Sequence, residues 1–137
     1  MPAALAGKGL SDTDRRVPET AATRMRERGT EMSENLTVVA DLFEMVEIAE
    51  SGIVSKAIVE NEHHKIVHFS FAKGQELSEH TASVPAVIHV LQGKGTVVLG
   101  GERHAAGPGS LYYMPADLRH AVVADEELVF LLTMFRT

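Results

Sequence analysis

The sequence predicts an all-β fold, an antiparallel β-sandwich or barrel, preceded by a polar N-terminal arm. Three observations predict this fold. Eight or nine short runs of β-forming residues follow one another from residue 53 onward. Glycine-rich turns separate these runs, and no long helical pattern interrupts them. Many short strands joined by frequent glycine turns are typical of sandwiches and barrels.

Residues 1–35 differ in composition from the rest of the chain. They are polar, rich in Arg, Glu, Thr and Ala, and poor in β-branched and aromatic side chains, so they can bury little surface. Pro18, the run ETAATRMRER and then Gly29 have the order of a short helix, with proline near its start and glycine past its end. We therefore expect a flexible, poorly structured or partly helical arm over 1–35 and a folded domain over 36–137.

Charge and composition exclude several classes of function. The formal net charge is −6, whereas nucleic acids and anionic membranes require a concentrated basic face. The absence of cysteine excludes disulfides, thiolate nucleophiles and cysteine-ligated metal sites, and it is compatible with a reducing cytoplasm. There is neither a signal-peptide core nor an apolar run near the ~20 residues of a membrane span. We expect a cytoplasmic protein that binds no nucleic acid and no membrane.

The individual runs show the alternation of β-strands. A lead-in segment at 42–46 fits either a short amphipathic helix or an irregular strand. In the strand expected at 65–72, Phe69 and Phe71 alternate with His68 and Ser70, as residues on opposite faces of a strand do. The other expected strands cover 53–59, 86–91, 96–99, 111–114, 120–123 and 128–135.

Two further features of the sequence predict a hairpin turn and a covered sheet face. Gly100-Gly101 separates two β-like runs and predicts a two-residue hairpin, because both central positions of a type I′ turn need positive φ. The runs at 86–91 and 128–135 carry more apolar surface than one small barrel needs. A covered sheet face, and therefore a homodimer, follows from that excess.

Glycines, a proline and two histidines have the spacing of two known motifs. The first set resembles the first cupin motif, in which a glycine precedes a histidine-rich segment and a second glycine follows it. The second set resembles the second cupin motif, in which glycine, proline and histidine follow at intervals of six and five residues. The residues are Gly74, His80 and Gly93 in the first motif, and Gly109, Pro115 and His120 in the second.

The resemblance covers roughly residues 50–137 and implies a jelly-roll barrel with an internal cavity. Members of this family often bind Mn, Fe, Ni, Zn or Cu through three histidines and one glutamate. Carried over by position, His80 and His120 match two of these ligands, but Ala82 stands at the second histidine and Ala86 at the glutamate. Asp117 replaces the glycine of the second motif.

Two histidines alone hold a divalent ion weakly, because a catalytic metal site generally has three protein ligands. His68, His89 and Asp117 are the candidates for a third ligand. By strand alternation His89 points away from the face of Ala86 unless a bulge intervenes, and Asp117 also fits a turn-stabilising role.

Two classes of function stay open. The first is a small-molecule-binding module of unknown ligand without metal-dependent turnover, which the incomplete ligand set favours. The second is a metal-dependent enzyme of the dioxygenase, isomerase or lyase kind with a nonstandard ligand set. A homodimeric scaffold without ligand is a third, weaker alternative. In the first two, the expected pocket is centred on two histidines and widened by two alanines. Its residues are His80, His120, Ala82, Ala86 and Met114.

Overall fold

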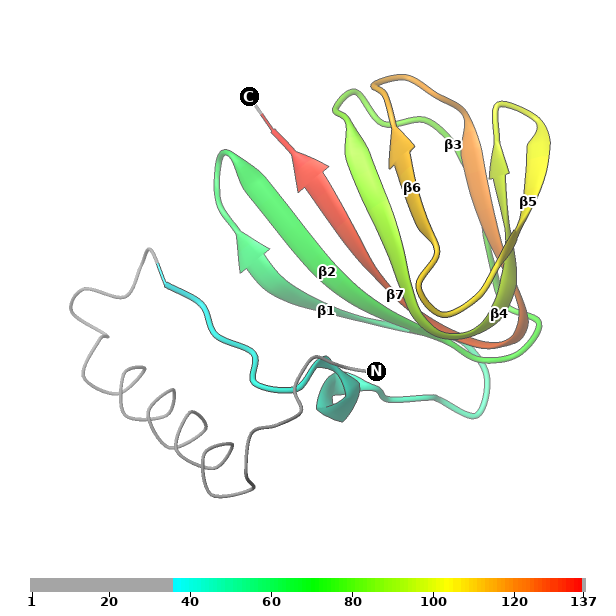
Figure 1. Cartoon of the computed structure of the whole chain (residues 1–137), viewed down its shortest axis with the longest axis horizontal. Coiled ribbons are helices and arrows are strands. Elements are labelled where there is room, and N and C mark those ends of the chain that lie inside the picture. The colour runs from blue at the N-terminus through cyan, green and yellow to red at the C-terminus, as the bar shows by residue number, and fades with distance from the viewer. Residues whose placement is uncertain (1–35, 137) are drawn as a thin grey trace. The chain divides into compact units, whose positions relative to one another are not determined.

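The structure, a computed structural model, describes residues 36–136, and the arm predicted at 1–35 lies outside the described residues. The barrel lies in a compact unit that begins at Phe43 (Figure 1). The described elements are η3 (Leu42–Met45), β1 (Ile53–Glu60), β2 (His64–Phe71), β3 (Glu76–His80), β4 (Ala86–Leu99), β5 (Glu102–Ala106), β6 (Leu111–Met114) and β7 (His120–Phe135). The predicted antiparallel all-β fold is confirmed. No helix among the described residues is long and apolar enough to cross a membrane.

Strands β4 and β7 are the longest in the described chain, and they join two sheets. They pair antiparallel along most of their lengths. On one side of the bend, β1, β2, β7, β4 and β6 form the first sheet in that order. On the other side, β3, β7, β4 and β5 form the second sheet. Figure 1 shows the two sheets curving toward each other, which leaves their inner faces opposed.

The runs predicted as separate strands at 86–91 and 96–99 are one strand in the structure. The register of β4 against β7 shifts between Val90 and Gln92 and again between Gly93 and Gly95. Gly93 has φ +96°, and a Cβ there would overlap the carbonyl oxygen of Glu127. Bulges of this kind bend a strand without ending it. The runs at 120–123 and 128–135 are likewise continuous in β7.

Apolar side chains from the inner faces of both sheets form the core. Phe69 of β2 lies opposite Phe130 of β7 in register, and their ring centroids are 5.1 Å apart. Phe71 contacts the same ring at 5.3 Å. The alternation predicted for β2 is present, since Phe71 lies in this core whereas His68 and Ser70 occupy the opposite, outer face.

The segment before β1 lies against the outer face of the first sheet. Its backbone amide at Glu47 donates a hydrogen bond to Oγ of Ser70, at 3.2 Å. Nζ of Lys56 donates to the carbonyl oxygen of Met45 at 3.0 Å and pairs with the Glu47 carboxylate at 3.0 Å. Of the two alternatives for 42–46, the structure shows the helix, as one short 3-10 turn.

The Gly-Gly hairpin is confirmed. Gly100 and Gly101 have φ values of 56° and 89°, and they connect Leu99 of β4 to its partner Glu102 of β5. Strand β3 was not predicted. Its sequence ELSEH has a single apolar residue, Leu77, so no alternation marks it as a strand.

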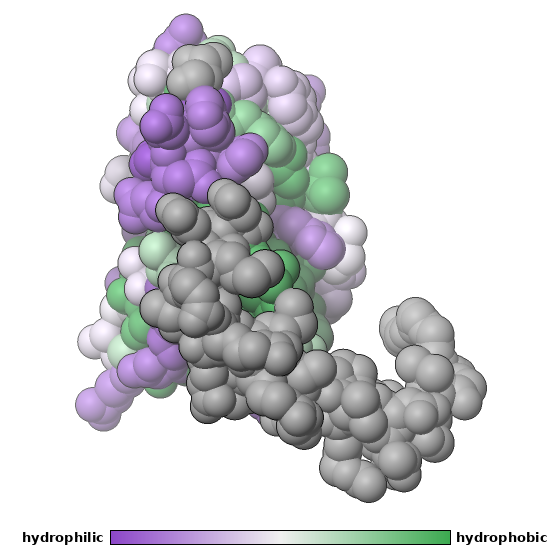
Figure 2. Space-filling model, turned by 90° about the vertical axis from the view of Figure 1, so that its left-hand side faces the viewer, coloured by the Kyte–Doolittle hydropathy of each residue, from purple (hydrophilic) through white to green (hydrophobic). Residues whose placement is uncertain are grey.

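Apolar side chains also remain at the surface. Figure 2 views the molecule from the left-hand side of Figure 1 and shows green apolar surface exposed beside purple hydrophilic surface. In the compact unit, the exposed large apolar side chains are Phe43, Ile53, Leu111, Tyr113 and Phe135.

Candidate ligand pocket

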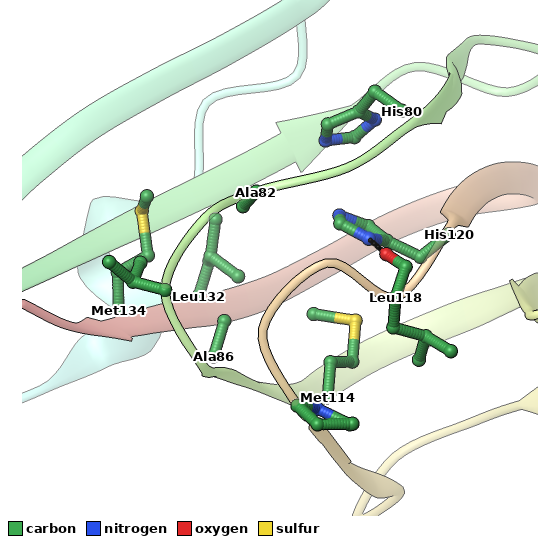
Figure 3. A pocket seen from close by; sticks show the side chains of 10 residues that line it. His80, Ala82, Ala86, Met114, Leu118, His120, Leu132 and Met134 are labelled. Atoms are coloured by element: carbon green, nitrogen blue, oxygen red, sulfur yellow. Dashed lines mark hydrogen bonds between the residues drawn. The ribbon is translucent and has the colours of Figure 1, made fainter.

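A small cavity of about 50 Å³ opens between the two sheets. Strands β3, β4, β6 and β7 and the loops beside them contribute its wall, which Figure 3 shows from close by. The lining residues are His80, Ala82, Val84, Ala86, Met114, Pro115, Leu118, His120, Leu132 and Met134. The structure therefore brings together all five residues that the sequence predicts for the pocket.

The two histidines lie side by side because their strands pair there. His80 at the end of β3 is the register partner of His120 at the start of β7. Their ring centroids are 4.2 Å apart with the planes tilted by 59°. His120 is 7% exposed, whereas His80 is exposed to solvent. One imidazole thus lies inside the barrel and the other at the pocket's mouth.

Backbone hydrogen bonds set the tautomer of both rings. Nδ1 of His80 lies 2.7 Å from the carbonyl oxygen of Ser78, and Nδ1 of His120 lies 2.9 Å from the carbonyl oxygen of Leu118. A carbonyl only accepts, so this network assigns the ring proton to Nδ1 in both histidines. In the neutral rings, each Nε2 then keeps its lone pair for a ligand.

Apart from the two imidazoles, the wall is apolar. Ala86 in β4 has Met114 of β6 on one side and Met134 of β7 on the other, in register. Ala86 and Met114 are buried, with 4% and 2% of their surfaces exposed. The two imidazoles therefore line a cavity that has no other polar side chain in its wall.

The four-ligand metal centre of the cupin motif does not fit these residues. Ala82 and Ala86 line the pocket at the positions of the second histidine and the glutamate, and a methyl group binds no metal. Across residues 36–136, no three His, Cys, Asp or Glu side chains are grouped so as to hold a metal ion. The pocket has two nitrogen ligands and no carboxylate.

None of the three candidates for an additional ligand lines the pocket. His68 is buried on the outer face of β2, between Lys56 of β1 and Leu131 of β7 in register. His89 lies in the same outer row of the sheet, opposite Leu131. The bulge in β4 comes after His89, so it does not turn this side chain inward.

Asp117 has a structural role in the loop after β6. It is exposed and has φ 69°, the left-handed conformation that the glycine of the motif adopts easily. Aspartate tolerates this conformation better than most residues with a Cβ. Its backbone amide donates to the carbonyl oxygen of Ala82 at 2.7 Å. Asp117 thus connects this loop to the segment after β3, and both flank the pocket.

Sequence reasoning missed half of the wall. Strand alternation could have found two of these residues, because Leu132 and Met134 are in phase with Phe130 on the inner face of β7. The other three lie outside regular strands, where no periodicity marks the inward direction. They are Val84, Pro115 and Leu118.

A two-sheet barrel with a histidine pair between its sheets defines the class of protein, and comparisons agree with it. The family model described as the cupin domain matches residues 67–134. The chain belongs to the cupins. A comparison of the sequence with the curated proteins finds no match.

Several solved structures share the fold. A conserved protein of unknown function from Streptococcus pyogenes is 28% identical with a TM-score of 0.68, and the match covers 75% of this chain and 90% of that one. A cupin 2 conserved barrel domain protein from Leptotrichia buccalis is 34% identical with a TM-score of 0.66, covering 69% and 46%. KdgF from a Halomonas species is 28% identical with a TM-score of 0.58, covering 63% and 81%.

Proposed function

We propose that this cupin is a small-molecule-binding protein whose pocket is centred on His80 and His120 and works without a divalent metal. One observation carries the proposal: both Nδ1 atoms are engaged by backbone carbonyls, and both rings line one small cavity. Two acceptor nitrogens at a common wall suit a ligand that donates hydrogen bonds, such as one with neighbouring hydroxyl groups.

The size of the cavity limits what enters it. A cavity of about 50 Å³ has room for a few water molecules, so it takes one end of an organic ligand rather than the whole molecule. The hydroxyl-bearing end would lie against the histidines. The adjoining apolar part would pack against Met114 and Leu132, in keeping with pockets that combine an apolar wall with few polar groups.

Ligand screening by nuclear magnetic resonance with small polyhydroxylated molecules tests this function. The double variant His80→Ala/His120→Ala is expected to lose the chemical-shift changes that the parent shows on ligand addition. His89→Ala is the matched control, since His89 lies outside the pocket lining, and it should bind as the parent does. Equal binding by the parent and the double variant would refute the proposed site.

The alternative is a metal-dependent enzyme with a nonstandard ligand set. The observation in its favour is that histidines bound to metals also donate Nδ1–H to a backbone carbonyl. Elemental mass spectrometry on untagged protein, purified without chelator, separates the two. Near-stoichiometric Fe, Mn, Ni, Zn or Cu that disappears in His120→Ala would support the enzyme. Substoichiometric amounts of these divalent metals are what the metal-free pocket predicts.

A homodimer in the cytoplasm is part of the proposal. Leu111 and Tyr113 alternate on the edge strand β6 and are 62% and 59% exposed. Beside them, the outer face of the first sheet continues through Val87, His89 and Leu131. An apolar sheet face of this kind is suited to a second copy of the chain related by two-fold symmetry.

A further inference from the structure

We infer that the ligand of this pocket is a phenol, a compound with a hydroxyl group on an aromatic ring, and that this hydroxyl donates a hydrogen bond to Nε2 of His120. The inference rests on the proposed function, because it uses the same pocket. It goes further by naming the class of ligand and by assigning unequal roles to His80 and His120.

The first step is the difference in burial between the two acceptors. His120 is 7% exposed, whereas His80 is exposed at the mouth of the pocket. Nδ1 of His120 is engaged by the carbonyl oxygen of Leu118, and no hydrogen bond within the described chain uses its Nε2. Figure 3 shows this second nitrogen on the side of the ring away from Leu118. Because water reaches His80 freely, the acceptor that gains most from a ligand's donor is Nε2 of His120.

The second step is the chemistry of the remaining wall. Apart from the two histidines, every lining side chain is apolar and uncharged. A hydroxyl group placed against such a wall loses its hydrogen bonds to water and finds no new partner. A sugar carries hydroxyl groups around its whole ring, so several of them would meet apolar side chains. A ligand with its hydroxyl at one end and hydrocarbon elsewhere avoids this cost.

The third step separates an aromatic ring from an aliphatic one. Two methionines, Met114 and Met134, line the pocket and are the register partners of Ala86 on either side. Thioether sulfur makes favourable contacts with aromatic rings, often at the ring edge. A phenolic hydroxyl is also more acidic than an aliphatic one, which makes it the stronger hydrogen-bond donor to a neutral imidazole. Both properties favour a phenol over an aliphatic alcohol.

The volume of the cavity decides how far the ring enters. An apolar cavity of roughly 150 Å³ holds a whole benzene ring, whereas this cavity measures about 50 Å³. The edge of the ring that bears the hydroxyl therefore lies inside, against His120, and the opposite edge stays at the mouth, near His80. A substituent opposite the hydroxyl is tolerated for this reason.

The test is a nuclear magnetic resonance titration of the full-length, chelator-treated protein at pH 8, where imidazole is neutral. The main probe is 4-methylphenol. Among the comparison probes, 4-methylanisole has the hydroxyl capped by a methyl group, 4-methylcyclohexanol lacks the aromatic ring, and methyl glucoside carries hydroxyls around its ring. We expect 4-methylphenol to bind at least about tenfold tighter than each of these. A comparison probe that binds as tightly as 4-methylphenol would overturn the inference.

Variants separate the roles of the two histidines. His120→Phe keeps a ring of similar size without the acceptor, and its affinity for 4-methylphenol should fall at least about tenfold. His80→Phe should lose less affinity, because water already competes for the exposed acceptor. His89→Phe is the matched control outside the pocket lining and should bind like the parent. Equal losses in His80→Phe and His120→Phe would contradict the role of His120. A thermal melt verifies folding, and if His120→Phe is unfolded, the comparison of probes on the parent decides alone.

Failure of this inference is distinct from failure of the proposed function. Methyl glucoside or another polyol that binds the parent but not His80→Ala/His120→Ala, with no preference for 4-methylphenol, would leave the proposed function standing and remove the phenol. No binding of either class of probe would remove both. Binding of 4-methylphenol only after a divalent metal is added would overturn the direct hydrogen bond to His120.

Discussion

The side chains of Ala82 and Ala86 end in a methyl group where the cupin motif has a histidine and a glutamate. Both lie in the pocket wall, so the substitutions remove two metal ligands without removing the cavity. What is left is a pair of imidazoles whose Nδ1 atoms are engaged by Ser78 and Leu118. At the scale of single residues, the pocket therefore combines two imidazoles with an apolar wall.

Placing a histidine at position 82 tests whether this alanine lies where a metal ligand would stand. In Ala82→His, a third imidazole joins His80 and His120, and three histidines form a common protein ligand set for Zn²⁺. We expect the dissociation constant for Zn²⁺ to fall at least about tenfold, measured by isothermal titration calorimetry. Ala105→His, which adds an imidazole on the exposed side of β5, is the control. Equal Zn²⁺ affinities for the two variants would show that position 82 does not face the histidine pair.

At the scale of elements, the bend in β4 allows one strand to serve both sheets. Gly93 and Gly95 stand at the register shifts, where β4 passes close to the backbone of β7. A Cβ at Gly95 would lie 2.6 Å from the carbonyl oxygen of Val123. Glycine is needed at these positions because the nearest opposing atom is in each case a backbone carbonyl oxygen, which cannot move aside as a flexible side chain does.

The loss of unfolding free energy on replacing glycine by alanine distinguishes a close backbone approach from a positive φ alone. Gly101 also has positive φ, but a Cβ there meets no atom within 4 Å. Gly101→Ala should therefore cost only about 1–2 kcal/mol of unfolding free energy for the left-handed conformation. Gly93→Ala should cost roughly 1–3 kcal/mol more, because of the overlap with Glu127. Urea denaturation measures the free energy of unfolding of both variants. Equal losses in the two would contradict the role of the close backbone approach at Gly93.

At the scale of the whole molecule, the outer face of the first sheet is covered at one side and exposed at the other. Near β1 and β2, the segment before β1 lies over it through the hydrogen bond from Glu47 to Ser70. Near β6, Leu111 and Tyr113 are exposed, and nothing in the described chain covers them. A second copy placed over β6 would bury this apolar surface, and the pockets of both copies, on the inner side of the sheet, would stay accessible.

A charge at this face should disrupt the proposed dimer. In Leu111→Asp/Tyr113→Asp, two carboxylates would have to lose water on association, so we expect the dimer dissociation constant to rise at least about tenfold. Analytical ultracentrifugation across a concentration series measures it. Ala105→Asp, with its charge on β5 of the second sheet, should dimerise as the parent does. A parent that sediments as a monomer at all concentrations would refute the dimer itself.

Much of the fold was predictable because it depends on local patterns. The alternation of Phe69 and Phe71 with His68 and Ser70 predicted the two faces of β2, and Gly100-Gly101 predicted the hairpin. The continuity of β4 and β7 was not predictable. In β4 it depends on bulges at Gly93 and Gly95, which resemble turn glycines when only the sequence is read. In β7 the gap between the two predicted runs is the polar segment 124–127, which has no apolar alternation. Strand β3 was missed because its pairing with β7 comes from tertiary context and not from an apolar pattern.

By itself, the sequence determined the class of fold, the pairing of His80 with His120 in one pocket, and the loss of two ligands at Ala82 and Ala86. The fold class follows from the strand and turn pattern, and the other two are what the resemblance to the cupin motifs implies for the residues at those positions. Only the tertiary structure decided the tautomer of the two imidazoles and the exclusion of His68 and His89 from the pocket. Each of these depends on which face of a bent strand a side chain occupies and on which carbonyl lies beside it. Those relations arise only when strands distant in the sequence pair with one another.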